Sequence, residues 1–362
     1  MASWYTPVPV DDVNSAVIDN YNKNIRYTEK LDYKKDIYHK KHCSENYPYP
    51  IKNEISYLAI SGGSDNGAYA AGFLKGWTKT KKRPNFKVVT GVSTGAIIAP
   101  FAFLGSDYDL TLEKMYTTMT REYVFVATII DILDGLTGGL AVTNTEPLKK
   151  QLQIYLTPEI INKIALENKK GRKLYISTTN LDTQDPVIWD IGAIADSGKK
   201  DSTDLIINIV LASSALPGVF PPVFFDVNVN GKQYKELHVD GGVVSQLLLP
   251  PETYQEECNV KRKLYLIRNS KLHSEYKVVR PRVYEIFSRS ISSIIKYQAY
   301  GDLYRMYMVV KNNDIDYNLA SIPDDFCHES KDVIFDKDYM IALFNRAYKD
   351  SSSGYKWKKN PF

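Results

Sequence analysis

The sequence has few cysteines and no long apolar run. Its 362 residues include three cysteines, Cys43, Cys258 and Cys327, which are too few for a disulfide framework and therefore say nothing for or against export. No run of about 18 apolar residues occurs, so we expect no transmembrane segment. The residues after Met1 are polar and contain proline, and they do not resemble a secretory signal.

Histidine is also scarce, which limits the ways of activating a nucleophile. The five histidines are His39, His42, His238, His273 and His328. The first two lie in a charged, tyrosine-rich stretch, and the last two lie in polar loops. His39, His42 and Cys43 provide too few neighbouring ligands for a metal site, so we expect neither a metal nor another cofactor.

The composition, 44% hydrophobic and 24% charged, is typical of one large α/β domain with additions. The net charge is +4, and basic clusters occur at 79–83, 169–173 and 261–263. Each cluster lies beside a predicted turn, which favours solvated loops, and contact with anionic lipid headgroups is a hypothesis. No nucleic-acid-binding motif is present.

Strands and helices alternate along residues 54–250 in the pattern of a doubly wound α/β fold. Strands are expected near 55–60, 86–90 and 173–179, and helices from 67, from 95, near 107–121 and near 145–166. Residues 1–53 are interpreted as an N-terminal extension and 251–362 as a C-terminal part packed on the domain at 54–250, with a strand at 263–268 and a helix near 281–309. The apolar, glycine-bearing residues 123–142 are expected to form either a lid or pocket wall, or a buried core segment.

The most informative motif is the G-x-S-x-G pentapeptide Gly91-Val92-Ser93-Thr94-Gly95. A β-branched run at 86–90 precedes it and an apolar run at 96–104 follows it, which predicts a sharp turn from a strand into a helix. A serine on such a turn is the nucleophile elbow of acyl hydrolases, where the helix N-terminus favours developing negative charge. Ser93 is therefore the candidate nucleophile.

A glycine-rich loop, Gly62 to Gly67, lies about thirty residues upstream, between an apolar strand and an alanine-rich helix. Its glycines do not fit the G-x-G-x-x-G dinucleotide pattern, and Ala68 stands where a Walker A loop needs lysine. The loop suits an oxyanion better than a diphosphate, and a plain strand-to-helix turn is the alternative.

Asp240 is the best candidate for the base. It ends an apolar strand and is followed by Gly241 and Gly242, which allow another group to approach closely. A carboxylate can deprotonate a serine directly where the two are packed together. His238 shares a strand face with Asp240, so a Ser-His-Asp arrangement stays open, and Asp-Gly also favours a hairpin turn.

The glycine loop, the pentapeptide and Asp240-Gly241-Gly242, in this order, resemble the patatin-like phospholipase family. The resemblance runs from about 55 to 249 and includes the connecting stretches 177–183 and 212–222. The segments 301–305 and 322–326 are similar to features of a bacterial subgroup, some of whose members are exported. Because some members of this subgroup are exported, export followed by removal of a signal peptide stays open for this chain.

This resemblance implies a three-layer α/β/α sandwich with a mostly parallel central sheet, and calcium-independent hydrolysis of lipid acyl esters through an acyl-enzyme. It implies a dyad of Ser93 as nucleophile and Asp240 as general base. The oxyanion donors map to the backbone of Gly62, Gly63 and Ser64. The other motif positions are Gly67, Gly91, Gly95, Gly241 and Gly242. The expected partner is a lipid, with peripheral membrane contact, and the oligomeric state is open.

The glycine loop departs from the family pattern at two positions. Ser64 replaces a third glycine, and Asn66 replaces an arginine or lysine, while Asp65 adds a negative charge. Loss of positive charge beside an oxyanion weakens its stabilisation. The alternative function is therefore a catalytically weak protein that binds lipid or a partner on the same scaffold. The sequence gives no sign of a groove that would bind a protein substrate, so hydrolysis of proteins is disfavoured.

Overall fold

The computed structural model describes residues 5–21, 25–28, 53–124, 141, 143–254, 260–328 and 334–361. The chain divides into two compact units, each built from distant segments. Unit 1 comprises Met1–Lys30 and Thr120–Val244, and unit 2 comprises Leu31–Met119 and Ser245–Phe362. His39, His42, Cys43 and most of the predicted lid lie outside the described residues.

Unit 2 contains a parallel sheet in the order β4-β3-β9-β10. Its strands are β3 (Asn53–Ile60), β4 (Val88–Val92), β9 (Val260–Lys271) and β10 (Ile315–Ile322). Most of their side chains are buried, as expected of parallel strands covered on both faces. Because the strands are parallel, the loops that follow β3, β4 and β9 leave the sheet at the same edge.

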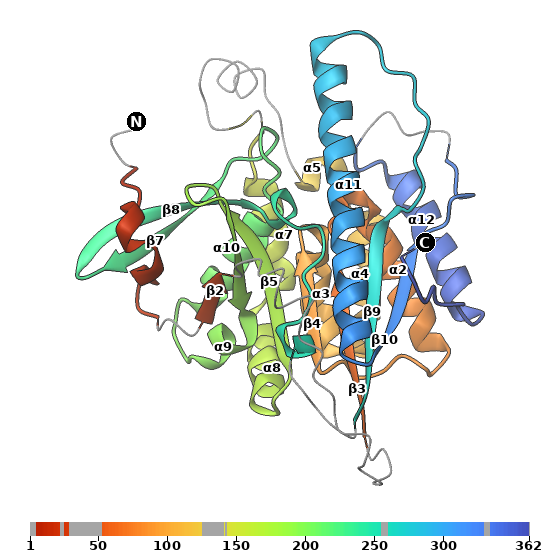
Figure 1. Ribbon diagram of the computed structural model, residues 1–362, viewed down its shortest axis with the longest axis horizontal. Helices are drawn as coiled ribbons and strands as arrows, with labels where there is room; N and C mark the ends of the chain where they lie inside the picture. The colour runs from red at the N-terminus through yellow and green to blue at the C-terminus, as the bar shows by residue number, and fades with distance from the viewer. Residues whose placement is uncertain are drawn as a thin grey trace. The chain divides into compact units, whose positions relative to one another are not determined.

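Helices cover both faces of this sheet (Figure 1). Successive side chains of β9 point to opposite faces. The ring centroids of Tyr265 and of Trp77 in α2 (Gly67–Lys79) are 4.9 Å apart. The Arg268 guanidinium carbon, in contrast, lies 5.2 Å from the centroid of the Tyr300 ring in α11 (Val283–Asn312). Helix α2 therefore lies on one face and α11 on the other. The remaining helices of the unit are α3 (Thr94–Leu104), α4 (Asp109–Thr118) and α12 (Lys337–Ser352), with short 3-10 turns at Ser64–Asn66, Ser106–Tyr108 and Pro251–Tyr254.

Unit 1 contains antiparallel strands: β1 pairs with β7, β7 with β8, β8 with β5, β5 with β6, and β6 with β2. The strands are β1 (Val17–Ile18), β2 (Arg26–Thr28), β5 (Lys173–Asn180), β6 (Asp185–Asp190), β7 (Val223–Val229) and β8 (Lys232–Asp240). The helices are α5 (Arg121–Val124), α7 (Glu146–Tyr155), α8 (Pro158–Lys169), α9 (Ile191–Asp196) and α10 (Ser202–Ser213), with 3-10 turns at Val10–Ser15 and Gly241–Val243.

The fold is α/β, with a mixed sheet flanked by helices, which confirms the predicted class. The predicted strands near 55–60, 173–179 and 263–268 and the helices from 67 and 95 are present. The helical stretch predicted at 145–166 is two helices, because Thr157 caps a new helix at Pro158 through a bond from the Ile160 N–H. The boundaries predicted at 53 and 250 stay a prediction. Within the described residues, no helix combines the length and apolar character needed to cross a membrane.

Candidate active site

Ser93 stands at the turn between β4 and α3 in a strained backbone conformation. Its φ is 55° and its ψ is −125°, a region that side-chain-bearing residues rarely adopt. Val92 and Thr94 are buried, whereas Ser93 is partly exposed. The turn therefore presents the serine at the carboxyl edge of the sheet and at the N-terminus of α3, as predicted for a nucleophile elbow.

The two glycines of the pentapeptide are required by close packing of the backbone. A Cβ atom on Gly91 would lie 2.4 Å from the Gly95 carbonyl oxygen, and one on Gly95 would lie 2.3 Å from the Ile60 carbonyl oxygen. Both distances are far below van der Waals contact. Gly95 thus allows the first turn of α3 to pack directly on the end of β3.

The glycine loop after β3 lies directly beside Ser93. A Cβ on Gly62 would be 3.2 Å from the Ser93 Cβ and 3.8 Å from its Oγ. Gly63 has a φ of 153°, and Ser64 has a φ of 54° although it carries a side chain. The structure therefore brings the predicted oxyanion loop and the predicted nucleophile together within unit 2.

The backbone N–H groups of this loop differ in their availability. The Gly62 N–H donates to the Gln246 carbonyl at 3.3 Å. The N–H groups of Gly63 and Ser64 have no hydrogen-bond acceptor among the described residues. Of the three predicted oxyanion donors, Gly63 and Ser64 are thus the two that are free to bind an anion.

Asn269, at the carboxyl end of β9, holds this loop in place. Its N–H donates to the Ser61 Oγ at 2.9 Å, and its Nδ2 donates to the Ser61 carbonyl at 2.9 Å. Its Oδ1 accepts from the Ala70 N–H of α2 at 3.1 Å. One buried amide therefore joins the strand before the loop to the helix after it. Asn269 was not predicted as a site residue, although its place directly after the strand predicted at 263–268 was a usable signal.

The side chains of Asp65 and Asn66 are bound to residues in the first turn of α12 or just before it. The Asp65 carboxylate accepts from the Phe335 N–H at 3.2 Å, and the Asn66 Oδ1 accepts from the Tyr339 hydroxyl at 2.6 Å. Burial, together with the Asp65 charge, raises the pKa of Tyr339. Position 66, basic in the family, thus serves as an anchor to α12 here.

Asp240 belongs to unit 1, where it ends β8. It is 5% exposed, and its Oδ1 accepts from the Gly242 N–H at 2.7 Å. Its carbonyl accepts from the Thr179 Oγ1 at 3.0 Å, and its N–H donates to the Ala215 carbonyl at 3.0 Å. Gly241 and Gly242 begin a 3-10 turn, so Asp-Gly-Gly is not a hairpin here. The carboxylate is therefore fixed by its own turn and by the neighbouring strand.

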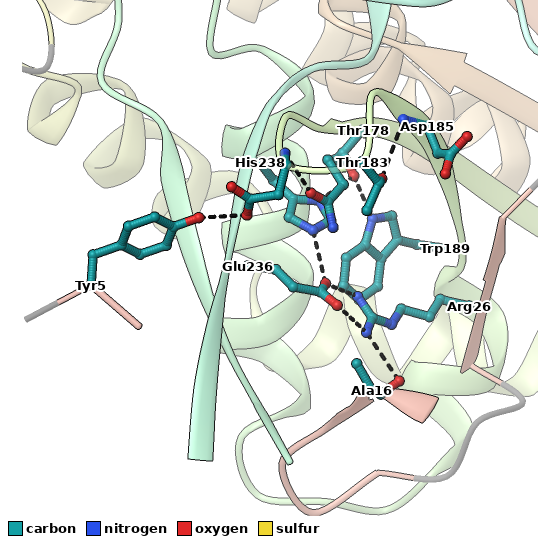
Figure 2. Close-up of polar contacts among 11 residues, drawn as sticks. Tyr5, Ala16, Arg26, Thr178, Thr183, Asp185, Trp189, Glu236 and His238 are labelled. Carbon is teal, nitrogen blue, oxygen red and sulfur yellow. Dashed lines mark hydrogen bonds and ion pairs between the residues drawn. The ribbon is translucent and has the colours of Figure 1, made fainter. Parts of the chain in front are cut away.

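His238 is fully buried in a chain of hydrogen bonds within unit 1 (Figure 2). Its Nε2 lies 3.1 Å from a Glu236 carboxylate oxygen, and its Nδ1 lies 2.8 Å from the Thr178 Oγ1, which also accepts from the Trp189 indole N–H. Burial lowers the pKa of His238, which favours the neutral ring. Since a carboxylate only accepts, Nε2 carries the proton and Nδ1 accepts from Thr178.

The Glu236 carboxylate in turn pairs with Arg26 of β2. Burial opposes its charge, but the bond to His238 and the Arg26 charge outweigh this and lower its pKa to about 2. Both ring nitrogens of His238 are thus occupied inside a buried ionic network, which leaves neither for a serine. His273 is exposed and pairs with Asp324. Among the described residues, no group of three or more histidine, cysteine or acidic side chains could hold a metal ion.

Comparison with known proteins gives one family match. The family described as Patatin-like phospholipase matches residues 58–251, a range that contains the glycine loop, Ser93 and Asp240. None of the curated proteins compared with this chain matches it.

The solved structures similar to the chain include VipD and ExoU. VipD from Legionella pneumophila is 13% identical with a TM-score of 0.40, and the alignment covers 84% of this chain and 67% of VipD. The type III effector protein ExoU is 13% identical with a TM-score of 0.34, and the alignment covers 83% of this chain and 53% of ExoU. The chain thus spans about half the length of ExoU.

Proposed function

Because the chain belongs to the patatin-like phospholipase family, we propose that it is a serine acyl hydrolase that cleaves carboxylic esters of phospholipids or related lipids. The observation that carries this proposal is local. Ser93 is held at a positive φ on a strand-to-helix turn, and beside it lies a loop in which the N–H groups of Gly63 and Ser64 have no acceptor among the described residues. A serine and an oxyanion site in contact are the minimum for acyl transfer.

In the proposed first step, the Ser93 Oγ attacks the ester carbonyl carbon while Asp240 accepts the hydroxyl proton. The negative charge that develops on the carbonyl oxygen is bound by the N–H groups of Gly63 and Ser64, helped by the N-terminus of α3. The tetrahedral intermediate then collapses. The bond to the alcohol breaks, the alcohol takes the proton from Asp240, and the acyl group stays on Ser93.

In the second step, Asp240 accepts a proton from water, and the resulting hydroxide attacks the acyl carbon of the Ser93 ester. Collapse releases the fatty acid and returns the proton to the Ser93 oxygen, which restores the enzyme. The setting of Asp240 supports its role, because a side chain that is 5% exposed and bonded to the Gly242 N–H is held in one place as a base must be. The engagement of both His238 nitrogens supports a dyad without histidine.

The proposal is tested by the rate of hydrolysis of a soluble short-chain ester. We expect Ser93→Ala and Asp240→Asn each to lower kcat by at least about a thousandfold, because each removes a group needed in both steps. His238→Gln is the control from the same strand, and its kcat should stay within about tenfold of the native value. Circular dichroism verifies that each variant is folded. If the kcat of Asp240→Asn equals that of the native chain, the dyad is ruled out.

The bond between the Gly62 N–H and Gln246 favours the second candidate, a catalytically weak lipid- or partner-binding protein, because it leaves two donors in the loop. This candidate predicts that the native chain binds lipid but hydrolyses no ester faster than Ser93→Ala does. Measurable turnover that depends on Ser93 eliminates it.

A further inference from the structure

The long helix α11 has two different halves. Its C-terminal half is anchored in unit 2 and buries Ala299, Leu303, Met306, Val309 and Val310. In residues 283–298, none of the side chains that the structure describes is buried. These turns extend beyond the ends of β9 and β10 (Figure 1). Packing on the sheet therefore does not explain why the first half is helical and apolar.

The exposed half of α11 is amphipathic, and its apolar side faces outward. Its exposed apolar residues are Val283, Ile286, Phe287, Ile294 and Tyr297, which are 51–87% exposed. Spacings of three, four and seven residues place them on one side of the helix. An apolar stripe normally faces the core, so this orientation is the reverse of the usual one.

The polar side of the same turns is bound to the protein. Arg289 donates to the Glu275 carbonyl and Lys296 donates to the His273 carbonyl, both in the segment that leads into α11. At 100° per residue these two side chains lie on the side opposite Phe287 and Ile294. The helix is thus fixed with its cations inward and its apolar residues outward, so the exposure is built into the fold.

Positive charge lies next to this apolar side. Lys277, Arg280 and Arg282 are exposed, and none of their side chains forms an ion pair with another residue that the structure describes. The flanking acidic residues are Glu275, which pairs with Lys271, and Glu285, which accepts from the Arg280 backbone N–H at 3.1 Å.

In the other basic clusters, Arg83 binds Asp109, Arg172 binds Glu167 and Lys263 binds Glu54. The other cations of clusters 79–83 and 261–263 include exposed lysines, namely Lys79, Lys81, Lys82 and Lys261. The cations before α11 differ from those lysines because they adjoin an exposed apolar helix side, and this combination suits an anionic lipid surface.

We propose that the α11 face, defined as residues 276–297, docks on an anionic lipid bilayer. Its apolar side chains enter the boundary between headgroups and acyl chains, and Lys277, Arg280 and Arg282 contact lipid phosphates. A half-apolar helix flanked by cations has the form of an interfacial membrane helix. The choice of a bilayer over a protein rests on the charge and also on the proposed lipid hydrolysis, which requires access to lipid.

The test measures binding of the full chain to vesicles, in a Ser93→Ala background that prevents hydrolysis. Vesicles of phosphatidylcholine alone are compared with vesicles that also contain phosphatidylglycerol. We expect the double variant Phe287→Ser/Ile294→Ser to bind both at least about tenfold more weakly, because two apolar side chains no longer enter the membrane. Arg280→Ser/Arg282→Ser should lose about tenfold only on the anionic vesicles. Leu110→Ser, at a 69% exposed leucine of α4, is the matched control and should bind normally.

The proposal is overturned if the native chain binds no vesicles, or if Phe287→Ser/Ile294→Ser binds as tightly as Leu110→Ser. It is also overturned if the native chain is a dimer that this double variant makes monomeric, because the face then takes a second copy. Hydrolysis of the soluble short-chain ester, measured with Ser93 intact, keeps the two proposals apart. If the native chain hydrolyses no ester but the Ser93→Ala chain binds vesicles, the proposed function is contradicted and docking is not. If the native chain hydrolyses the ester but the chain does not bind vesicles, docking is contradicted and the proposed function is not.

Discussion

At the scale of single residues, the nucleophile turn depends on contacts that leave no room for a side chain. Ser93 holds a positive φ because Gly91 and Gly95 let the strand, the turn and α3 pack at backbone distance. The loop beside it is fixed through Asn269, which bonds to Ser61 and to Ala70. These contacts store strain at Ser93, and the surrounding packing stabilises it.

Gly95→Ala tests this packing. The added methyl group would lie 2.3 Å from the Ile60 carbonyl oxygen, so we expect a loss of about 1–3 kcal/mol in the free energy of unfolding. The displaced turn should also lower kcat. The control is Gly301→Ala in α11, where a Cβ has nothing within 4 Å and alanine favours helix, so stability should rise by up to about 1 kcal/mol. Urea unfolding measures both. Equal stability of Gly95→Ala and the native chain would contradict the packing argument.

Short-range patterns identified the residues of the candidate site that depend on local geometry. Ser93, Gly62 and Gly95 were predicted because a tight turn imposes its own sequence. The structure places Gly62 beside the Ser93 side chain and Gly95 against the backbone of Ile60 and Ser61. Asn269 and Gln246 were missed because their roles come from residues about 200 positions away. No local pattern encodes which loop a buried amide will hold.

At the scale of elements, α11 and the segment after Val244 are connected to the glycine loop by hydrogen bonds. Asp302 of α11 accepts from the Gln246 N–H at 2.7 Å, and the Gln246 carbonyl accepts from the Gly62 N–H. The Leu248 carbonyl accepts from the Thr90 Oγ1 of β4 at 2.7 Å. The segment 245–249 therefore ties both the oxyanion loop and the strand before Ser93 to a helix on the face of the sheet.

Asp302 should make stability depend on pH. Burial raises its pKa to about 6, despite bonds from the Gln246 N–H and the nearby charge of Arg305. Because the folded state holds this proton more tightly than the unfolded chain, the stabilisation is full below about pH 4, is lost as the pH rises to about 6, and levels off above that. Between pH 4.5 and 7 we expect Asp302 to contribute a loss of about 2 kcal/mol in the free energy of unfolding, and Asp302→Asn should remove this contribution.

Urea unfolding of the native chain and of Asp302→Asn at several pH values checks this expectation. Glu236 acts in the opposite direction, since its pKa of about 2 makes stability rise with pH below about 4.5, which is below the range measured. His238 also acts in the opposite direction, because its lowered pKa makes stability rise with pH up to about 6.5. The contribution of Asp302 is therefore the difference in slope between the native chain and Asp302→Asn. The same slope in both proteins between pH 4.5 and 7 would show that Asp302 is not the group responsible.

Elements were predicted well where the pattern was strong and locally determined. Strands β3 and β9 and the helices α2 and α3 have the expected places. Strand β4 begins two residues later than expected, and β10 and α12 were not predicted. The full length of β8 was missed because its first residues, such as Lys232 and Lys235, are charged and lie at the outer end of the β7–β8 pair. The helix at 283–312 was predicted, but which of its sides faces the sheet depends on contacts with β10 and the segment before it.

At the scale of the whole molecule, the candidate catalytic residues come from two units. The glycine loop and Ser93 belong to unit 2, and Asp240 belongs to unit 1. Unit 1 also joins the start of the chain to the strand of Asp240, because Arg26 of β2 pairs with Glu236 of β8. The proposed dyad therefore requires each unit to keep its own part of the site in shape. The sequence predicted the family, but it did not predict that Ser93 and Asp240 would belong to different units.

The central claim is that Asp240, and not a histidine, activates Ser93. The most direct measurement is the rate at which a fluorophosphonate probe becomes covalently attached, followed by mass spectrometry of the intact chain. We predict labelling of the native protein at Ser93, none in Ser93→Ala, labelling at least about a hundredfold slower in Asp240→Asn, and a near-native rate in His238→Gln. A native rate in Asp240→Asn, or loss of labelling in a folded His238→Gln, would contradict the account.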